Sequence, residues 1–243
     1  MVLAVRNLHK TFVLHAIEGR HVTALRGVDL DVEAGAHVAL AGPSGAGKSS
    51  LLKCVYRTYL PTSGAVMFAP STGPVVDLTR LDDREVTVLR GQEIGYVSQF
   101  LRAEPRRSTL DVVANAGVRR GMQRDEAIAA ARTILARVGL EPTLWAVYPS
   151  VLSGGEKQRV NLAAGVISPP RLLLLDEPIS ALDPANKESV LQLIDELTTH
   201  GVAVLSVFHD MDAIARVATK VVWMSDGAVV ASGTPADVLE RVQ

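Results

Sequence analysis

The residues best suited to chemistry form a glycine-rich run, GPSGAGKSS, at positions 42–50. It fits the pattern G-x-x-x-x-G-K-[ST], with a short apolar run before it and a helix-like run after it. Glycines in such a loop let backbone N–H groups face phosphate oxygens, while Lys48 adds a positive charge and the Ser49 hydroxyl can ligate Mg²⁺. A chance glycine-rich loop is the alternative, and the pattern arises by accident in about one chain per hundred. The predicted phosphate-binding residues are Gly42, Pro43, Ser44, Gly45, Ala46, Gly47, Lys48, Ser49 and Ser50.

Two adjacent carboxylates, Asp176 and Glu177, follow the apolar run LLLL. In open α/β sheets ligands bind at the carboxyl ends of the strands, where these side chains would lie. We expect Asp176 to hold the metal and Glu177 to take a proton from an attacking water as general base. Acidic residues are common at solvated strand ends, so this interpretation depends on the phosphate loop being present.

A second helix start that could face phosphate lies in LSGGEKQ at positions 152–158. Ser153, Gly154 and Gly155 combine a hydroxyl with small residues and exposed N–H groups, which are suited to an anion. Taken alone, such a run is more often a flexible loop. Its position between the phosphate loop and the acidic pair gives it more weight.

The elements that must position these residues alternate between strands and helices. Apolar runs predict strands near 2–8, 22–32, 37–41, 94–98, 172–175, 202–208, 221–224 and 228–231. This order is typical of an α/β fold with a mostly parallel sheet flanked by helices, and hairpins at both ends of the chain suggest antiparallel edge strands. We expect one domain over 1–243, with a core at 1–99 and 156–243 and an inserted helical subdomain at about 100–155.

Composition narrows the class of protein. The 243 residues carry 25 Lys and Arg against 26 Asp and Glu, which disfavours a nucleic-acid coat or a polybasic membrane anchor. The lone Cys54 allows neither an internal disulfide nor a cysteine zinc site, and its helical context predicts a buried side chain. No run approaches the roughly 18–20 apolar residues of a membrane span, and no secretory signal opens the chain, so we expect a cytoplasmic protein.

The ordered motifs resemble the ATP-binding subunits of ABC-type ATPases over nearly the whole chain. Beyond the three sites above, they include Gln99 in YVSQF, SALD at 180–183 and His209. The resemblance implies ATP and Mg²⁺ as cofactors, Gln99 at the metal and the attacking water, and His209 at the γ-phosphate. It also implies a head-to-tail dimer, with ATP held between residues 42–50 of one subunit and 153–155 of the other, and with Asp183 in a loop that communicates across the dimer.

Small departures from the commonest family pattern leave the catalytic set complete. Glu156 stands where Gln is usual, Ser50 where Thr is usual, and Ile179 where a small or hydroxyl residue is usual. The adenine-stacking aromatic would be Phe12, where Tyr is commoner. Core packing is the equally weighted alternative for Phe12.

Several less generic stretches resemble one branch, the ATPase L component of the phosphonate-degrading carbon–phosphorus lyase system. They are KTFVLH at 10–15, VYRTYLP at 55–61, GYVSQFLR at 95–102 with PR at 105–106, LDVV at 110–113 and FHD at 208–210. That resemblance implies an ATP-hydrolysing subunit of the transferase activity that makes α-D-ribose 1-methylphosphonate 5-triphosphate. Its partners would be a second ABC ATPase, the K component, and the lyase core complex.

Two other functions remain open at this point. The first is an ATPase subunit of a transporter of the lipoprotein-release or exporter type, which shares the SGGE motif and a similar length. The second is an ABC protein that acts on DNA or ribosomes, which the near-neutral charge and the presence of a single nucleotide-binding domain disfavour, so we expect no nucleic-acid partner.

Overall fold

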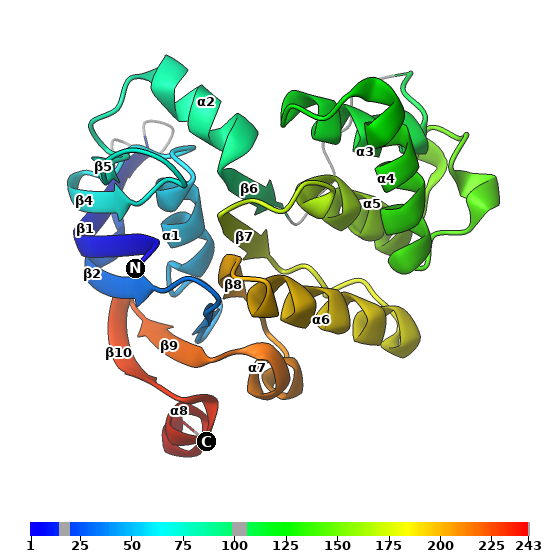
Figure 1. The fold of residues 1–243 in the computed structure, drawn as a ribbon. Coiled ribbons are helices and arrows are strands. Elements are labelled where there is room, and N and C mark those ends of the chain that lie inside the picture. Colours follow the sequence, from blue (N-terminus) through cyan, green and yellow to red (C-terminus); the bar gives the residue numbers. More distant parts are fainter. Residues whose placement is uncertain (15–19, 99–105, 243) are drawn as a thin grey trace.

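A computed structural model describes residues 1–14, 20–98 and 106–242. Over these residues the larger sheet has six strands in the order β10-β9-β3-β8-β7-β6 (Figure 1). Neighbouring strands from β9 to β6 run parallel, and only β10 is antiparallel to its neighbour β9. The strands are β3 (His37–Ala41), β6 (Ile94–Val97), β7 (Leu172–Asp176), β8 (Ala203–Val207), β9 (Lys220–Ser225) and β10 (Ala228–Gly233). The predicted α/β fold with a mostly parallel sheet is confirmed.

The N-terminal strands form a second, antiparallel sheet with the order β2-β1-β4-β5 in the described residues. Its strands are β1 (Leu3–Leu14), β2 (Arg20–Val32), β4 (Ser63–Phe68) and β5 (Val76–Asp77). We predicted edge strands of the parallel sheet at both ends of the chain. This is right for the β9–β10 hairpin and wrong for the N-terminal strands.

Helix α1 (Lys48–Val55) explains the separation of the two sheets, because its apolar side chains meet both of them. Leu51, Leu52 and Val55 belong to one buried cluster with residues of β1, β2 and β4 on one side and of β3, β7 and β8 on the other. Cys54 lies in the same cluster with 0% exposure, and burial raises the pKa of its thiol to about 11. The prediction of a buried Cys54 is confirmed.

Strand β7 shows how the larger sheet separates two cores. Leu172 and Leu174 face the cluster around α1, whereas Leu173 and Leu175 face a second cluster built from helices. Side chains alternate between the faces of a strand, so a run of four leucines is what a strand buried on both faces requires.

The helices lie around the larger sheet, and three of them, α3, α4 and α5, form a group on one side of it (Figure 1). Helices α3 and α4 pack on each other and on α5, and the side chains of Asp82 and Ser108 cap the starts of α2 and α3. The helices are α2 (Asp83–Gln92), α3 (Thr109–Arg119), α4 (Arg124–Arg137), α5 (Gly154–Val166), α6 (Pro184–Thr199), α7 (Met211–Val217) and α8 (Pro235–Val242), with 3₁₀ turns η1 (Pro142–Leu144) and η2 (Pro149–Val151).

Residues 106–155 hold helices and turns without a strand, in line with the predicted helical insertion. The division into a core and a subdomain at these bounds stays a prediction. Within the described part of the chain, none of the helices combines the length and the apolar character needed to cross a membrane.

Candidate active site

The parallel strands bring the predicted site residues to one edge of the larger sheet. The glycine-rich loop follows β3. Asp176 is the last residue of β7 and Glu177 comes directly after it, while His209 lies two residues after β8. Because β3, β8 and β7 are adjacent and parallel, the loops after them lie together at the carboxyl edge. Gln99, predicted at the metal and the attacking water, lies outside the described residues.

The loop at 42–47 has a backbone that side chains would obstruct. Gly42 and Gly47 have φ values of 129° and 98°, and a Cβ atom there would lie 2.0 Å and 2.4 Å from the carbonyl oxygens of Met224 and Ala24. A Cβ on Gly45 would meet nothing within 4 Å, so the loop is open at that point. This shape leaves room for a phosphate group while it fixes the loop against the neighbouring strands.

Lys48 lies within this loop and is almost completely buried. Its Nζ donates hydrogen bonds to the carbonyl oxygens of Gly42 at 2.7 Å and Pro43 at 2.8 Å. Burial lowers the pKa of Lys48, and the negative charge of Glu177 opposes that shift. A phosphate in the loop would offer this ammonium a stronger, charged acceptor than the two carbonyls.

Ser49 and Asp176, two of the predicted metal ligands, are brought together. The Ser49 hydroxyl donates to Asp176 Oδ1 at 2.9 Å, and the Tyr96 hydroxyl donates to Asp176 Oδ2 at 3.0 Å. A hydroxyl beside a carboxylate fits Mg²⁺, which prefers oxygen ligands. The described ranges contain no group of three or more His, Cys, Asp and Glu side chains that could hold a metal.

Glu177 and His209 form a second polar pair. His209 Nε2 lies 2.9 Å from Glu177 Oε1, and the His209 side chain is more exposed than that of Glu177. Glu177 has a φ of 55°, a left-handed conformation that is uncommon outside glycine and that often marks functional residues. The left-handed backbone of Glu177 and its contact with His209 favour a functional role for the pair over an acidic residue that is merely solvated at a strand end.

Gln158, on α5, holds the strained backbone of Glu177. Its buried side-chain amide donates to the Glu177 carbonyl oxygen and accepts from the Ala181 N–H at 3.0 Å. The Ser180 hydroxyl donates to the same Glu177 carbonyl at 3.2 Å. Gln158 thus links the helix that begins at the LSGGEKQ motif to the loop that carries the acidic pair.

Two residues at the site, Gln158 and Tyr96, had no predicted role. Tyr96 lies in YVSQF and Gln158 in LSGGEKQ, two motifs in which roles were predicted only for other residues. The parallel register pairs Tyr96 with Leu174, two residues before Asp176, so the Tyr96 and Asp176 side chains share a face of the sheet. Register between β6 and β7 would have identified Tyr96, whereas no pattern in the sequence places the Gln158 amide.

Helix α5 begins at the motif predicted to be a second phosphate-facing helix start, and its contact with phosphate stays a prediction. Ser153 Oγ accepts from the Glu156 N–H, and the Glu156 carboxylate accepts from the Ser153 N–H at 2.7 Å, which completes a capping box. A Cβ on Gly154 would meet nothing within 4 Å, whereas one on Gly155 would lie 2.8 Å from the Ala181 carbonyl oxygen. The helix start is thus open at Gly154 and tightly packed at Gly155.

Phe12 and Asp183 have local partners that do not test their predicted roles. Phe12 makes an edge contact with Tyr59 at a centroid distance of 5.1 Å, and Lys10 Nζ lies 4.7 Å from the centroid of the Phe12 ring. Asp183 caps α6 by accepting from the Asn186 N–H, and the Asn186 side-chain hydrogen bond holds the pKa of Asp183 below its usual value. Adenine stacking by Phe12 and dimer communication by Asp183 stay predictions.

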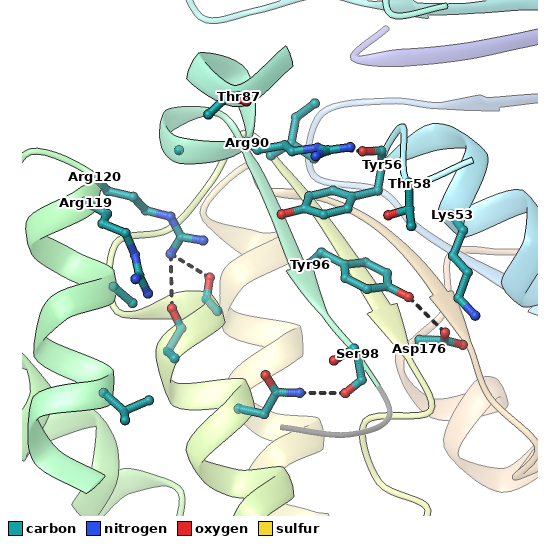
Figure 2. A pocket seen from close by; sticks show the side chains of 17 residues that line it. Lys53, Tyr56, Thr58, Thr87, Arg90, Tyr96, Ser98, Arg119, Arg120 and Asp176 are labelled. Carbon is teal, nitrogen blue, oxygen red and sulfur yellow. Dashed lines mark hydrogen bonds between the residues drawn. The ribbon is translucent and has the colours of Figure 1, made fainter. Parts of the chain in front are cut away.

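A cleft of about 650 Å³ opens beside the metal-ligand pair (Figure 2). Its walls come from α1, α2, β6, α3 and α5, and Asp176 lies at one end of it. The basic side chains of Lys53, Arg90, Arg119 and Arg120 line this cleft, and Asp176 is the one acidic residue among its described lining residues. The cleft therefore extends from the candidate site at Asp176 to the helices α3 and α5.

Comparison with known families gives one match over most of the chain. The family model described as "ABC transporter" matches residues 25–180, a span that begins in β2 and ends after the acidic pair. That span includes the glycine-rich loop, the α5 start and both acidic residues.

Curated relatives match the whole chain at moderate identity. The L-cystine import ATP-binding protein TcyN of Bacillus subtilis (strain 168) is 34% identical over 100% of this chain and 89% of its own. The lipoprotein-releasing system ATP-binding protein LolD of Ruegeria sp. (strain TM1040) is 37% identical over 95% of this chain and 98% of its own. A methionine import ATP-binding protein MetN of Haemophilus influenzae (strain 86-028NP) is 36% identical over 98% of this chain, which spans 66% of that longer protein.

A solved structure is similar over nearly its full length. It is described as a dimeric, post-hydrolysis state of the ATP-binding cassette MJ0796 bound to ADP and Pi. The two chains share 29% identity with a TM-score of 0.87, covering 96% of this chain and 98% of that one. The fold is therefore that of an ATP-binding cassette.

Proposed function

Because the chain belongs to the family of ABC transporter ATPases, we propose that it binds ATP with Mg²⁺ at residues 42–50 and hydrolyses it as half of a head-to-tail dimer. The observation that carries this proposal is the meeting of two polar pairs at one sheet edge. Ser49 with Asp176 can hold the metal, and Glu177 with His209 can act on an attacking water. Both pairs lie beside a loop whose open glycine backbone suits phosphates.

Each side chain has a distinct role in the proposed reaction. The Lys48 ammonium would exchange the carbonyls of Gly42 and Pro43 for the β- and γ-phosphates. Ser49 and Asp176 would hold Mg²⁺, which when bound would neutralise developing negative charge. Glu177 accepts the proton of the attacking water. His209 keeps the Glu177 carboxylate oriented and reaches the γ-phosphate from the exposed side.

The dimer is supported by the second helix start and by the structural neighbour. Helix α5 begins directly after Ser153, and a Cβ on Gly154 in its first turn would meet nothing within 4 Å, so the helix start is open there. A helix N-terminus attracts anions, so Ser153, Gly154 and Gly155 would bind the ATP held by the partner's phosphate loop. The similar cassette MJ0796 is dimeric.

We expect the rate of ATP hydrolysis per subunit to rise with protein concentration, because dimers form as the concentration increases. A specific activity that stays constant over the same concentrations would contradict the dimer.

Gln158→Leu should lower the maximal rate of ATP hydrolysis about tenfold with little change in ATP affinity. Leucine removes the amide donor to the Glu177 carbonyl, which keeps only the Ser180 hydroxyl among the side-chain donors described for it, and leaves the Ala181 N–H without its side-chain acceptor, so the strained Glu177 backbone can relax. Steady-state kinetics that separate kcat from KM would measure this. Gln192→Leu is the matched control, because Gln192 contacts only the exposed Glu188 on α6 among the contacts described for it. Equal kcat values in Gln158→Leu and Gln192→Leu would show that Gln158 does not contribute to ATP hydrolysis.

For the partner, the comparisons favour a membrane transporter over the carbon–phosphorus lyase system. The three relatives described above are named for L-cystine import, methionine import and lipoprotein release, and not for phosphonate metabolism. We therefore propose an ATPase subunit of an ABC transporter, as in the alternative function drawn from the sequence. Identities between 34% and 37% to proteins with three different cargoes do not select one of these cargoes.

The lyase-associated role is retained as a second candidate because of specific sequence stretches. VYRTYLP at 55–61 and LDVV at 110–113 lie on and near the walls of the cleft in Figure 2, where Tyr56 and Val112 are lining residues. We propose this cleft, with its four basic side chains, as the place where the partner protein docks. In this candidate the partners are the K component and the lyase core.

One experiment separates the two candidates. Extracts of cells with and without this gene are supplied with methylphosphonate and ATP, and ³¹P NMR follows the ribose 1-methylphosphonate 5-triphosphate formed. Since an extract needs no uptake, a transporter subunit is dispensable and the product forms in both. Loss of the product in the deletion extract alone, restored by adding the purified protein, would establish the lyase-associated role and refute the transporter.

A further inference from the structure

Tyr96 connects the metal-binding carboxylate to the cleft. It lies on β6, and its hydroxyl donates a hydrogen bond to Asp176 Oδ2 at 3.0 Å (Figure 2). Ser49 donates to the other carboxylate oxygen at 2.9 Å. The nearly buried Asp176 is thus held from both oxygens by hydroxyl groups that come from different elements.

The Tyr96 ring is itself held by a stack that reaches helix α2. Tyr56, just after α1, stacks on Tyr96 with ring centroids 4.8 Å apart and an interplanar angle of 20°. The Arg90 guanidinium lies 4.5 Å from the centroid of the Tyr56 ring, and Arg90 Nε donates to the Tyr56 carbonyl oxygen at 2.8 Å. Figure 2 shows these side chains along one wall of the cleft.

We propose that Tyr96 is a positioning residue for Asp176, which fixes the carboxylate in the orientation that Mg²⁺ requires. This inference rests on the proposed function, because it assigns the metal to Ser49 and Asp176. A carboxylate that is free to rotate must be ordered when the metal arrives, whereas one held by outer hydrogen bonds is ready to bind. Loss of such an outer partner typically costs about 10–100-fold in metal affinity.

The test compares Tyr96→Phe with Tyr56→Phe. The first removes the hydroxyl bonded to Asp176 and keeps the ring in the stack, and the second removes a hydroxyl from the neighbouring ring. Binding of the non-hydrolysable analogue AMP-PNP is measured by calorimetry in EDTA and at increasing Mg²⁺. We expect the Mg²⁺ concentration for half-maximal enhancement of binding to rise about tenfold in Tyr96→Phe and to stay unchanged in Tyr56→Phe. Affinity in EDTA should be unchanged in both.

Each other outcome has a definite meaning. An unchanged Mg²⁺ requirement in Tyr96→Phe, or an equal shift in Tyr56→Phe, overturns the role of the Tyr96 hydroxyl. If the unmodified protein shows no Mg²⁺-dependent binding, the proposed function fails instead. Should Tyr96→Phe not fold, Tyr56→Leu removes the ring on which Tyr96 stacks. It should shift the Mg²⁺ requirement about threefold in the same direction, and no shift there also overturns the inference.

Discussion

Glu177→Gln should keep ATP bound while steady-state hydrolysis falls by about 10²–10⁴-fold, the range expected for loss of a general base. The amide has nearly the same size as the carboxylate, so the loop and the His209 contact can persist with the proton donor and acceptor reassigned. What is lost is the ability to take a proton from the attacking water. The chain would therefore reach the ATP-bound state and stay there.

The measurement pairs ATPase assays with size-exclusion chromatography in the presence of ATP. If the closed dimer forms on binding and opens on hydrolysis, Glu177→Gln should elute as a dimer with ATP and as a monomer without it. Glu188→Gln is the matched control, since Glu188 is an exposed carboxylate on α6 that pairs with Arg216. Normal ATPase activity in Glu177→Gln would refute its assignment as general base.

The candidate site could be predicted largely from sequence because its parts follow consecutive strands of a parallel sheet. The loop after β3 and the acidic pair after β7 each follow a short apolar run, and parallel strands end at one edge. Strand β8 lies between β3 and β7, so the order of the strands in the sheet is also needed to bring Ser49 and Asp176 together. The catalytic roles of these residues still stand as proposals.

The arrangement of the N-terminal strands and the contacts of Tyr96 and Gln158 could not be predicted in this way. Alternation in β1 and β2 shows that one face is buried, but it does not say which sheet the strands join. Helix α1 decides this by packing apolar residues against two sheets at once. The Gln158 amide and the Tyr96 hydroxyl act across elements far apart in the sequence, so only the packed structure brings them to Glu177 and Asp176.

Lys48→Ala should weaken ATP binding by about 10–100-fold, as expected for loss of a charged hydrogen bond to phosphate. In the structure the Lys48 ammonium is buried among the carbonyl oxygens of Gly42 and Pro43. Those carbonyls keep the loop closed around the lysine, so the alanine variant loses both the charge and the group that organises the loop. Calorimetry with AMP-PNP and Mg²⁺ would measure the affinity.

Lys220→Ala is the matched control, because Lys220 begins β9 at the amino edge of the sheet, opposite the site. It removes the same charge from the protein, so a purely electrostatic effect of net charge would weaken both variants equally. A specific phosphate contact weakens only Lys48→Ala. If Lys48→Ala keeps its affinity for AMP-PNP, the glycine-rich loop does not hold the phosphates. The metal-binding roles proposed for Ser49 and Asp176 beside the loop would then be refuted as well.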